Sequence, residues 1–123
     1  MDKFDLEDRL VDFAVLTIKL SKLLPNNYIG NHLGGQLVRS GTSTALNYGE
    51  AQSAESRKDF LHKIKIVLKE LRETLVCLKI ITRSDLMNNN DLVVFGIKES
   101  NELISIFVKS TRTVQKNLIK PRD

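Results

Sequence analysis

Apolar residues recur with helical spacing along four segments of the 123-residue chain. The clearest segment lies between Phe60 and Ile81, where apolar residues advance in alternating steps of three and four, as they do on one face of an α-helix. This line consists of Leu61, Ile64, Leu68, Leu71, Leu75 and Leu78. The same kind of pattern predicts helices at about residues 5–24, 33–52, 56–83 and 91–118. Because the connections are short, we predict an all-α, antiparallel up-down-up-down four-helix bundle that forms one domain over residues 1–123.

Local signals refine two of these helices. The segment PNNYIGNH, before the second helix, is predicted to be a turn because Pro, Asn and Gly favour turns. Ser56 and Asp59 match the S-x-x-D/E signal that begins a helix, here the third. Gly41 lies inside the second helix, where glycine costs about 1 kcal/mol relative to alanine. We therefore predict that another backbone comes close to Gly41.

The third helix also carries a line of cations, which we call the basic stripe. Basic residues repeat at every seventh position from Lys58 to Lys79, and further ones lie on the same face. The stripe consists of Lys58, Lys65, Lys69, Arg72, Lys79 and Arg83. One interpretation is a solvated face, or a face paired with acidic residues of the first helix. The other is a track for nucleic-acid phosphates, which regularly spaced cations bind without reading bases.

Apolar residues near the basic stripe suggest a third interpretation, self-association. Ile66 and Ile80 lie away from the apolar line of the third helix, and Val76 interrupts the stripe. A partner surface that covers them is consistent with this pattern. Asp5, Asp8 and Asp12 form an acidic patch on the first helix. If the acidic patch of one copy met the basic stripe of the next, the contact would be heterologous and would close into a ring.

Composition adds modest constraints. The formal net charge of +4 favours anionic partners. Cys77 is the single cysteine, and the chain has neither a signal-peptide pattern nor a membrane-length apolar run, so we expect a cytoplasmic protein. His32 and His62 lack the Glu-x-x-His spacing of di-iron bundles. We predict no catalytic residues, no metal site and no cofactor.

The stretch QLVRSGTSTALNYGEAQSAESRKDFLHKIKIVLKELRETL resembles the signature of the four helix bundle protein family, also called 23S rRNA intervening-sequence proteins. The matching positions are Gln36, Leu37, Arg39, Ser43, Asn47, Glu50, Phe60, Leu61, Glu70 and Leu71. This resemblance implies a ring, typically a homopentamer, without known catalytic activity. The family is similar to accessory proteins of diversity-generating retroelements, which bind nucleic acid and a reverse transcriptase through a basic surface.

The resemblance also suggests roles for four polar residues of the second helix. Ser43 and Asn47 lie one turn apart and are expected to form helix–helix hydrogen bonds. Arg39 and Glu50 are expected to form an ion pair, either inside the bundle or between subunits.

The leading hypothesis is a non-enzymatic oligomer that binds RNA or DNA non-specifically through the basic stripe. The alternative is a protein–protein scaffold or accessory subunit, in which the stripe contacts another subunit or a partner protein.

Overall fold

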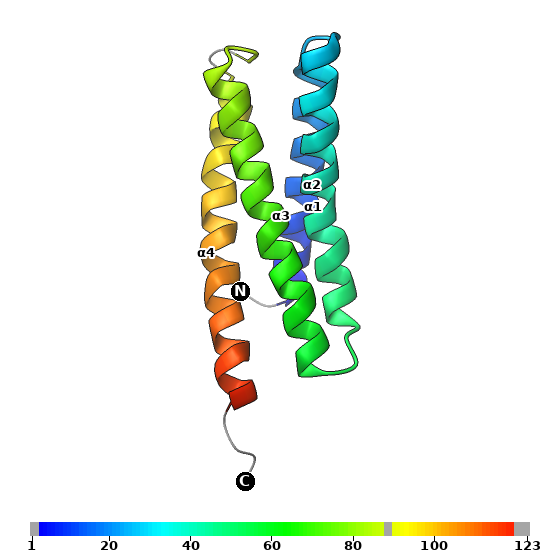
Figure 1. Ribbon diagram of the computed structural model, residues 1–123, viewed down its shortest axis with the longest axis vertical. Coiled ribbons are helices and arrows are strands. Elements are labelled where there is room, and N and C mark those ends of the chain that lie inside the picture. The colour runs from blue at the N-terminus through cyan, green and yellow to red at the C-terminus, as the bar shows by residue number, and fades with distance from the viewer. Residues whose placement is uncertain (1–2, 88–89, 120–123) are drawn as a thin grey trace.

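The computed structural model describes residues 3–87 and 90–119, which fold into four α-helices (Figure 1). The helices are α1 (Lys3–Leu23), α2 (Tyr28–Gln52), α3 (Arg57–Arg83) and α4 (Asp91–Ile119). No strand occurs within these two described ranges. The predicted all-α, four-helix fold is confirmed, and α3 runs without a break through the apolar line and the basic stripe.

Contacts between α2 and α3 give the relative direction of these two helices. The Ser40 hydroxyl lies 2.8 Å from that of Thr74, and Glu50 forms a 2.5 Å ion pair with Lys63. A residue later in α2 therefore contacts a residue earlier in α3, so the two helices run antiparallel. Figure 1 shows the same reversal after α1 and after α3, so consecutive helices run in opposite directions. Each helix packs on the next, and α1 and α4 close the bundle with the smallest contact of the neighbouring pairs.

The core lies along the shared axis of the four helices. Its largest fully buried side chains include Phe13 of α1, Leu37 of α2, Leu71 of α3 and Phe107 of α4. Tyr48 meets Phe107 edge to face, with ring centroids 5.7 Å apart, so α2 and α4 touch across the centre. The apolar line of α3 supplies buried Ile64, Leu71, Leu75 and Leu78, whereas Leu61 and Leu68 are half-buried. The line does face the core, as its spacing predicts.

The start of α2 differs from the sequence-based expectation. The helix begins at Tyr28, rather than near Leu33, because Asn27 caps it: the Asn27 side chain accepts a hydrogen bond from the backbone N–H of Gly30, at 2.9 Å. A Cβ atom on Gly30 would lie 2.9 Å from the carbonyl carbon of Pro25, so only glycine fits this tight entry. Residues typical of turns therefore form the cap and first turn of a helix. At α3 the expected cap is present, because Ser56 Oγ accepts from the N–H of Asp59 at 3.0 Å.

Gly41 lies where α2 packs tightly against α1. A Cβ atom at this position would lie 2.8 Å from Thr17 Cβ and closer still to the Thr17 Oγ1 and Cγ2 atoms. The expected close approach is present, but the neighbouring group is the Thr17 side chain rather than a backbone. Thr17 is fully buried, so it fills the space that the missing side chain leaves.

Within the described parts of the chain, none of the helices combines the length and apolar character that a membrane span requires.

Candidate nucleic-acid interface

The basic stripe forms one exposed line on the outer face of α3. All six of its side chains are exposed, from Lys58 near the beginning of the helix to Arg83 at its end. At 1.5 Å of rise per residue, the stripe is about 38 Å long. Because the whole line belongs to one uninterrupted helix, its charges keep fixed positions relative to one another.

The basic stripe forms no salt bridge with acidic groups of the described residues. The salt bridges among the described residues involve the cations Arg9, Arg39 and Lys63, none of which belongs to the stripe. The acidic patch of α1 lies across the bundle, since α1 and α3 form a diagonal pair whose backbones do not approach each other. The patch therefore does not neutralise the stripe within one molecule. This excludes the interpretation in which the stripe is paired with acidic residues of the first helix of the same chain.

Apolar side chains beside the stripe are exposed to different degrees. Val76 and Ile80 leave 54% and 46% of their surface accessible. Ile66, expected in the same exposed group, is instead half-buried. The uncovered apolar surface of this face is thus concentrated near the C-terminal end of α3.

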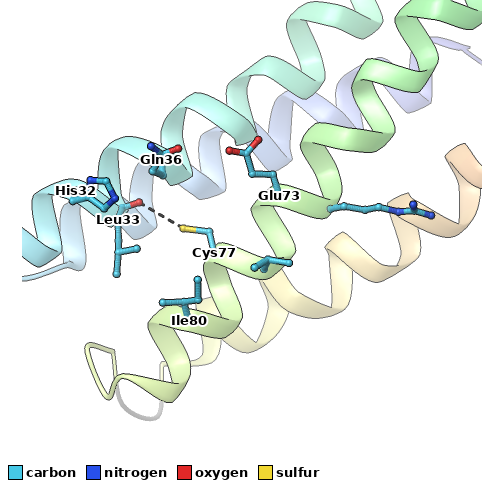
Figure 2. Close-up of a pocket in the computed structure, with 8 residues that line it drawn as sticks. His32, Leu33, Gln36, Glu73, Cys77 and Ile80 are labelled. Carbon is cyan, nitrogen blue, oxygen red and sulfur yellow. Dashed lines mark hydrogen bonds between the residues drawn. The ribbon is translucent and has the colours of Figure 1, made fainter.

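A hollow between α2 and α3, which we call the α2–α3 groove, adjoins that apolar surface. Its volume is about 430 Å³. Figure 2 labels six of the residues that line it: His32, Leu33, Gln36, Glu73, Cys77 and Ile80. The first three come from α2 and the others from α3. The α3 residues Arg72 and Val76 also line the groove, so it opens directly beside the basic stripe.

Cys77 forms part of the groove wall as a neutral thiol. Its Sγ lies 3.7 Å from the backbone carbonyl oxygen of Leu33, which accepts the weak hydrogen bond (Figure 2). Burial, with a smaller contribution from the Glu73 charge, raises the pKa of the Cys77 thiol to about 11. Thiolates are the reactive form of cysteine, so this side chain contributes apolar surface rather than a nucleophile at neutral pH.

Arg39 links two carboxylates at the edge of the groove. Its Nη1 donates to Glu70 Oε2 at 3.2 Å, and its Nη2 donates to Glu73 Oε1. Desolvation raises the pKa of the nearly buried Glu70, and the charge of Glu73 adds to this effect. The hydrogen bond from Arg39 lowers the pKa of the more exposed Glu73. One arginine thus holds two carboxylates whose pKa values shift in opposite directions.

The contacts of the α2 polar residues correct two expectations. Within one chain, Arg39 and Glu50 do not pair with each other: Glu50 binds Lys63, whereas Arg39 binds the α3 carboxylates. The two residues lie three turns apart on α2, too far for a direct contact. Asn47 Nδ2 donates to the backbone oxygen and the hydroxyl of Ser43, both at 2.9 Å, so their hydrogen bond lies within α2 rather than between helices.

The sequence analysis did not include two aromatic residues, Tyr28 and His32, in the candidate interface. Tyr28 and His32 lie one turn apart on α2, with ring centroids 6.3 Å apart and ring planes 14° from parallel. Tyr28 leaves 81% of its surface accessible. Their spacing of four is a helical signal, but it was hidden because the segment that contains them has the composition of a turn.

The opposite pKa shifts of Glu70 and Glu73 predict opposite effects of their neutral variants. Because the pKa of Glu70 is raised on folding, its titration lowers stability as pH rises above its ordinary value of 4.5. Glu70→Gln should therefore be more stable than wild type at pH 7, and this advantage should disappear toward pH 4.5. Urea unfolding across that pH range measures the difference.

Glu73→Gln is the matched control for this prediction. The lowered pKa of Glu73 stabilises the fold above pH 4.5, and that contribution is lost as pH falls through the lowered value. This variant should lose a few tenths to about 1 kcal/mol at pH 7, because the ion pair with Arg39 is partly exposed. If both variants lost the same free energy of unfolding, the conclusion that the Glu70 charge destabilises the fold would be wrong.

No group of three or more histidine, cysteine, aspartate or glutamate side chains is arranged to hold a metal ion in residues 3–87 and 90–119.

Both the sequence and the fold match known proteins. A solved structure from Bacteroides thetaiotaomicron VPI-5482 is described as a protein with unknown function from the S23 ribosomal protein family. It is similar to this chain at 30% identity and a TM-score of 0.77, over 85% of this chain and 96% of that one. No functionally curated protein matches the sequence. The family model of the 23S rRNA-intervening sequence protein matches residues 3–109, so the chain belongs to this family.

Proposed function

We propose that this protein is a non-enzymatic oligomer that binds RNA or DNA without sequence specificity through the outer face of α3. The observation that carries this proposal is the exposed basic stripe, which has no salt bridge among the described residues. Lysine and arginine side chains that contact phosphates fix the position of a nucleic acid but do not identify its bases. A straight line of such contacts therefore binds many sequences with similar affinity.

The family description supports testing RNA first. It refers to an intervening sequence of 23S rRNA, and neither it nor the description of the Bacteroides thetaiotaomicron structure indicates an enzyme. The single cysteine and the lack of a membrane-spanning helix in the described residues are consistent with a cytoplasmic location, where RNA is abundant.

A salt titration tests the proposal. Binding of labelled RNA and DNA is measured by filter retention between about 50 and 200 mM salt. If all six cations contact phosphates, the logarithm of the binding constant should fall against the logarithm of salt concentration with a slope of about −5 for duplex DNA and about −4 for a single strand. No retention of either nucleic acid at the lowest salt concentration would refute the proposal.

Self-association is the second candidate, and exposed apolar residues favour it. Val11, Val15 and Ile18 form an exposed apolar line on α1, beside Asp8 and Asp12. On the diagonally placed α3, Val76 and Ile80 are exposed beside cations. Because the two faces differ and lie on different sides of the bundle, contact between them would be heterologous and could close into a ring, such as a pentamer. In that case the basic stripe binds a neighbouring subunit, or a partner protein such as a reverse transcriptase.

A further inference from the structure

The α2–α3 groove and the basic stripe share one side of the bundle. Arg72 belongs to the stripe and also lines the groove. Val76 and Ile80 continue from the stripe into the groove, and both are exposed. A strand whose phosphates follow the stripe therefore passes the mouth of the groove, with its bases within reach of an apolar surface.

From this arrangement we infer that the protein prefers single-stranded nucleic acid, with the stripe holding phosphates and the α2–α3 groove receiving an unstacked base. The inference rests on the proposed function. In a duplex the bases are paired and stacked inside the helix, so they cannot enter a side pocket without being extruded. A single strand presents its bases without that cost, and proteins bind such bases on aromatic and apolar groups.

The groove offers surfaces that suit a planar base. Its volume of about 430 Å³ lies within the range of small-molecule sites. Leu33, Cys77 and Ile80 provide apolar contact, and the Cys77 thiol is uncharged at neutral pH. At the other end of the lining, the Gln36 amide and the Glu73 carboxylate provide polar groups for the edge of a base (Figure 2). Arg39 holds Glu73, which reduces the repulsion between this carboxylate and a phosphate.

Tyr28 and His32 extend this surface beyond the groove. His32 lines the groove, and the ring of Tyr28 lies nearly parallel to the His32 ring, one helical turn away. Both residues are exposed, so bases can reach them. Stacking on aromatic rings is tolerant of sequence because every base has a π-face. Single-strand preference is therefore compatible with binding that lacks sequence specificity.

A second copy of the chain explains the surface less well. The acidic patch on α1 extends from Asp5 to Asp12, about 10 Å along its helix, whereas the basic stripe is about 38 Å long. A neighbouring subunit docked through that patch would leave most stripe cations without anionic partners. A nucleic-acid backbone carries charges along the whole line.

The test compares a single-stranded oligouridylate with a fully paired RNA duplex of the same length, at one salt concentration, by fluorescence anisotropy. Wild type should bind the single strand more tightly. The double variant Tyr28→Ala/His32→Ala should bind it about 5- to 100-fold more weakly, the loss expected for removal of base stacking. Duplex affinity should change less than about twofold, since the phosphate contacts remain.

Phe95→Ala is the matched control, because Phe95 is an exposed aromatic residue on α4, outside the groove. It should bind both probes as wild type does, and circular dichroism should show that all variants are folded. Equal binding of both probes, unchanged by the double variant, would overturn the inference and leave the proposed function intact. Binding of neither probe would refute the proposed function itself. Loss of self-association in Tyr28→Ala/His32→Ala, with unchanged oligouridylate binding, would assign the groove to a contact between copies and overturn the inference.

Discussion

Replacement of both Lys65 and Arg72 by glutamate should abolish nucleic-acid binding, with a loss of at least about 100-fold at low salt. Both residues lie in the basic stripe, are exposed, and form no salt bridge in the described structure. The double variant removes two phosphate contacts and places two anions in the path of the backbone. The salt dependence should also become shallower, since each lost contact contributes about 0.9 to the slope for duplex DNA. Filter binding over a salt series measures both effects.

The matched control is Lys109→Glu/Arg112→Glu on α4, where both residues are exposed. Each double variant lowers the formal net charge from +4 to zero, so they differ only in where the charge changes. The α4 control should retain most of its affinity. Similar losses in both variants would mean that net charge, rather than the stripe, governs binding. If the stripe variant dissociates an oligomer in light scattering, the stripe is a subunit interface instead.

Gly41→Ala should lower the free energy of unfolding by about 2 kcal/mol, although alanine favours a helix by about 1 kcal/mol relative to glycine. The new methyl group would overlap the Thr17 side chain, which lies between α1 and α2. Thr17 is fully buried, and its hydroxyl donates a 2.7 Å hydrogen bond to the backbone oxygen of Ala14, so it cannot move aside freely. Urea denaturation measures the loss.

Gly35→Ala provides the control, because a Cβ atom on Gly35 meets no other atom within 4 Å. This variant should gain about 0.5–1 kcal/mol from helix propensity alone. Thr17→Ala should partly rescue Gly41→Ala, since it removes two of the three overlapping atoms and leaves Cβ at 2.8 Å. A coupling energy of at least about 0.5 kcal/mol is expected in this double-mutant cycle. If Gly41→Ala were as stable as Gly35→Ala, tight packing at Thr17 would be ruled out.

Periodicity within each helix was enough to predict the fold. A repeat of apolar residues every three or four positions identifies the buried side of a helix without knowledge of its neighbours, and Leu71 and Leu78 are indeed fully buried. The position of the basic stripe on the exposed side follows from the same geometry. The start of α2 was missed because Asn27 and Gly30 favour both turns and helix caps, and the sequence alone does not decide between these roles.

The pairing of polar residues between helices could not be predicted in this way. The partners of Arg39 and Glu50 depend on the register of α2 against α3, which is set by packing along both helices. The same register places His32 and Ile80 on the wall of one hollow, the α2–α3 groove. Neither helix carries a signal for a groove in its own sequence.

The contact between α1 and α4 is the smallest among the neighbouring pairs of helices. No loop joins α1 directly to α4, because α2 and α3 lie between them in the chain. Arg9 bridges α1 and α4, with 2.6 Å ion pairs to Glu99 and Glu102. Partial unfolding should therefore begin with separation of these two helices, while α2 and α3, and the proposed nucleic-acid interface on them, stay assembled.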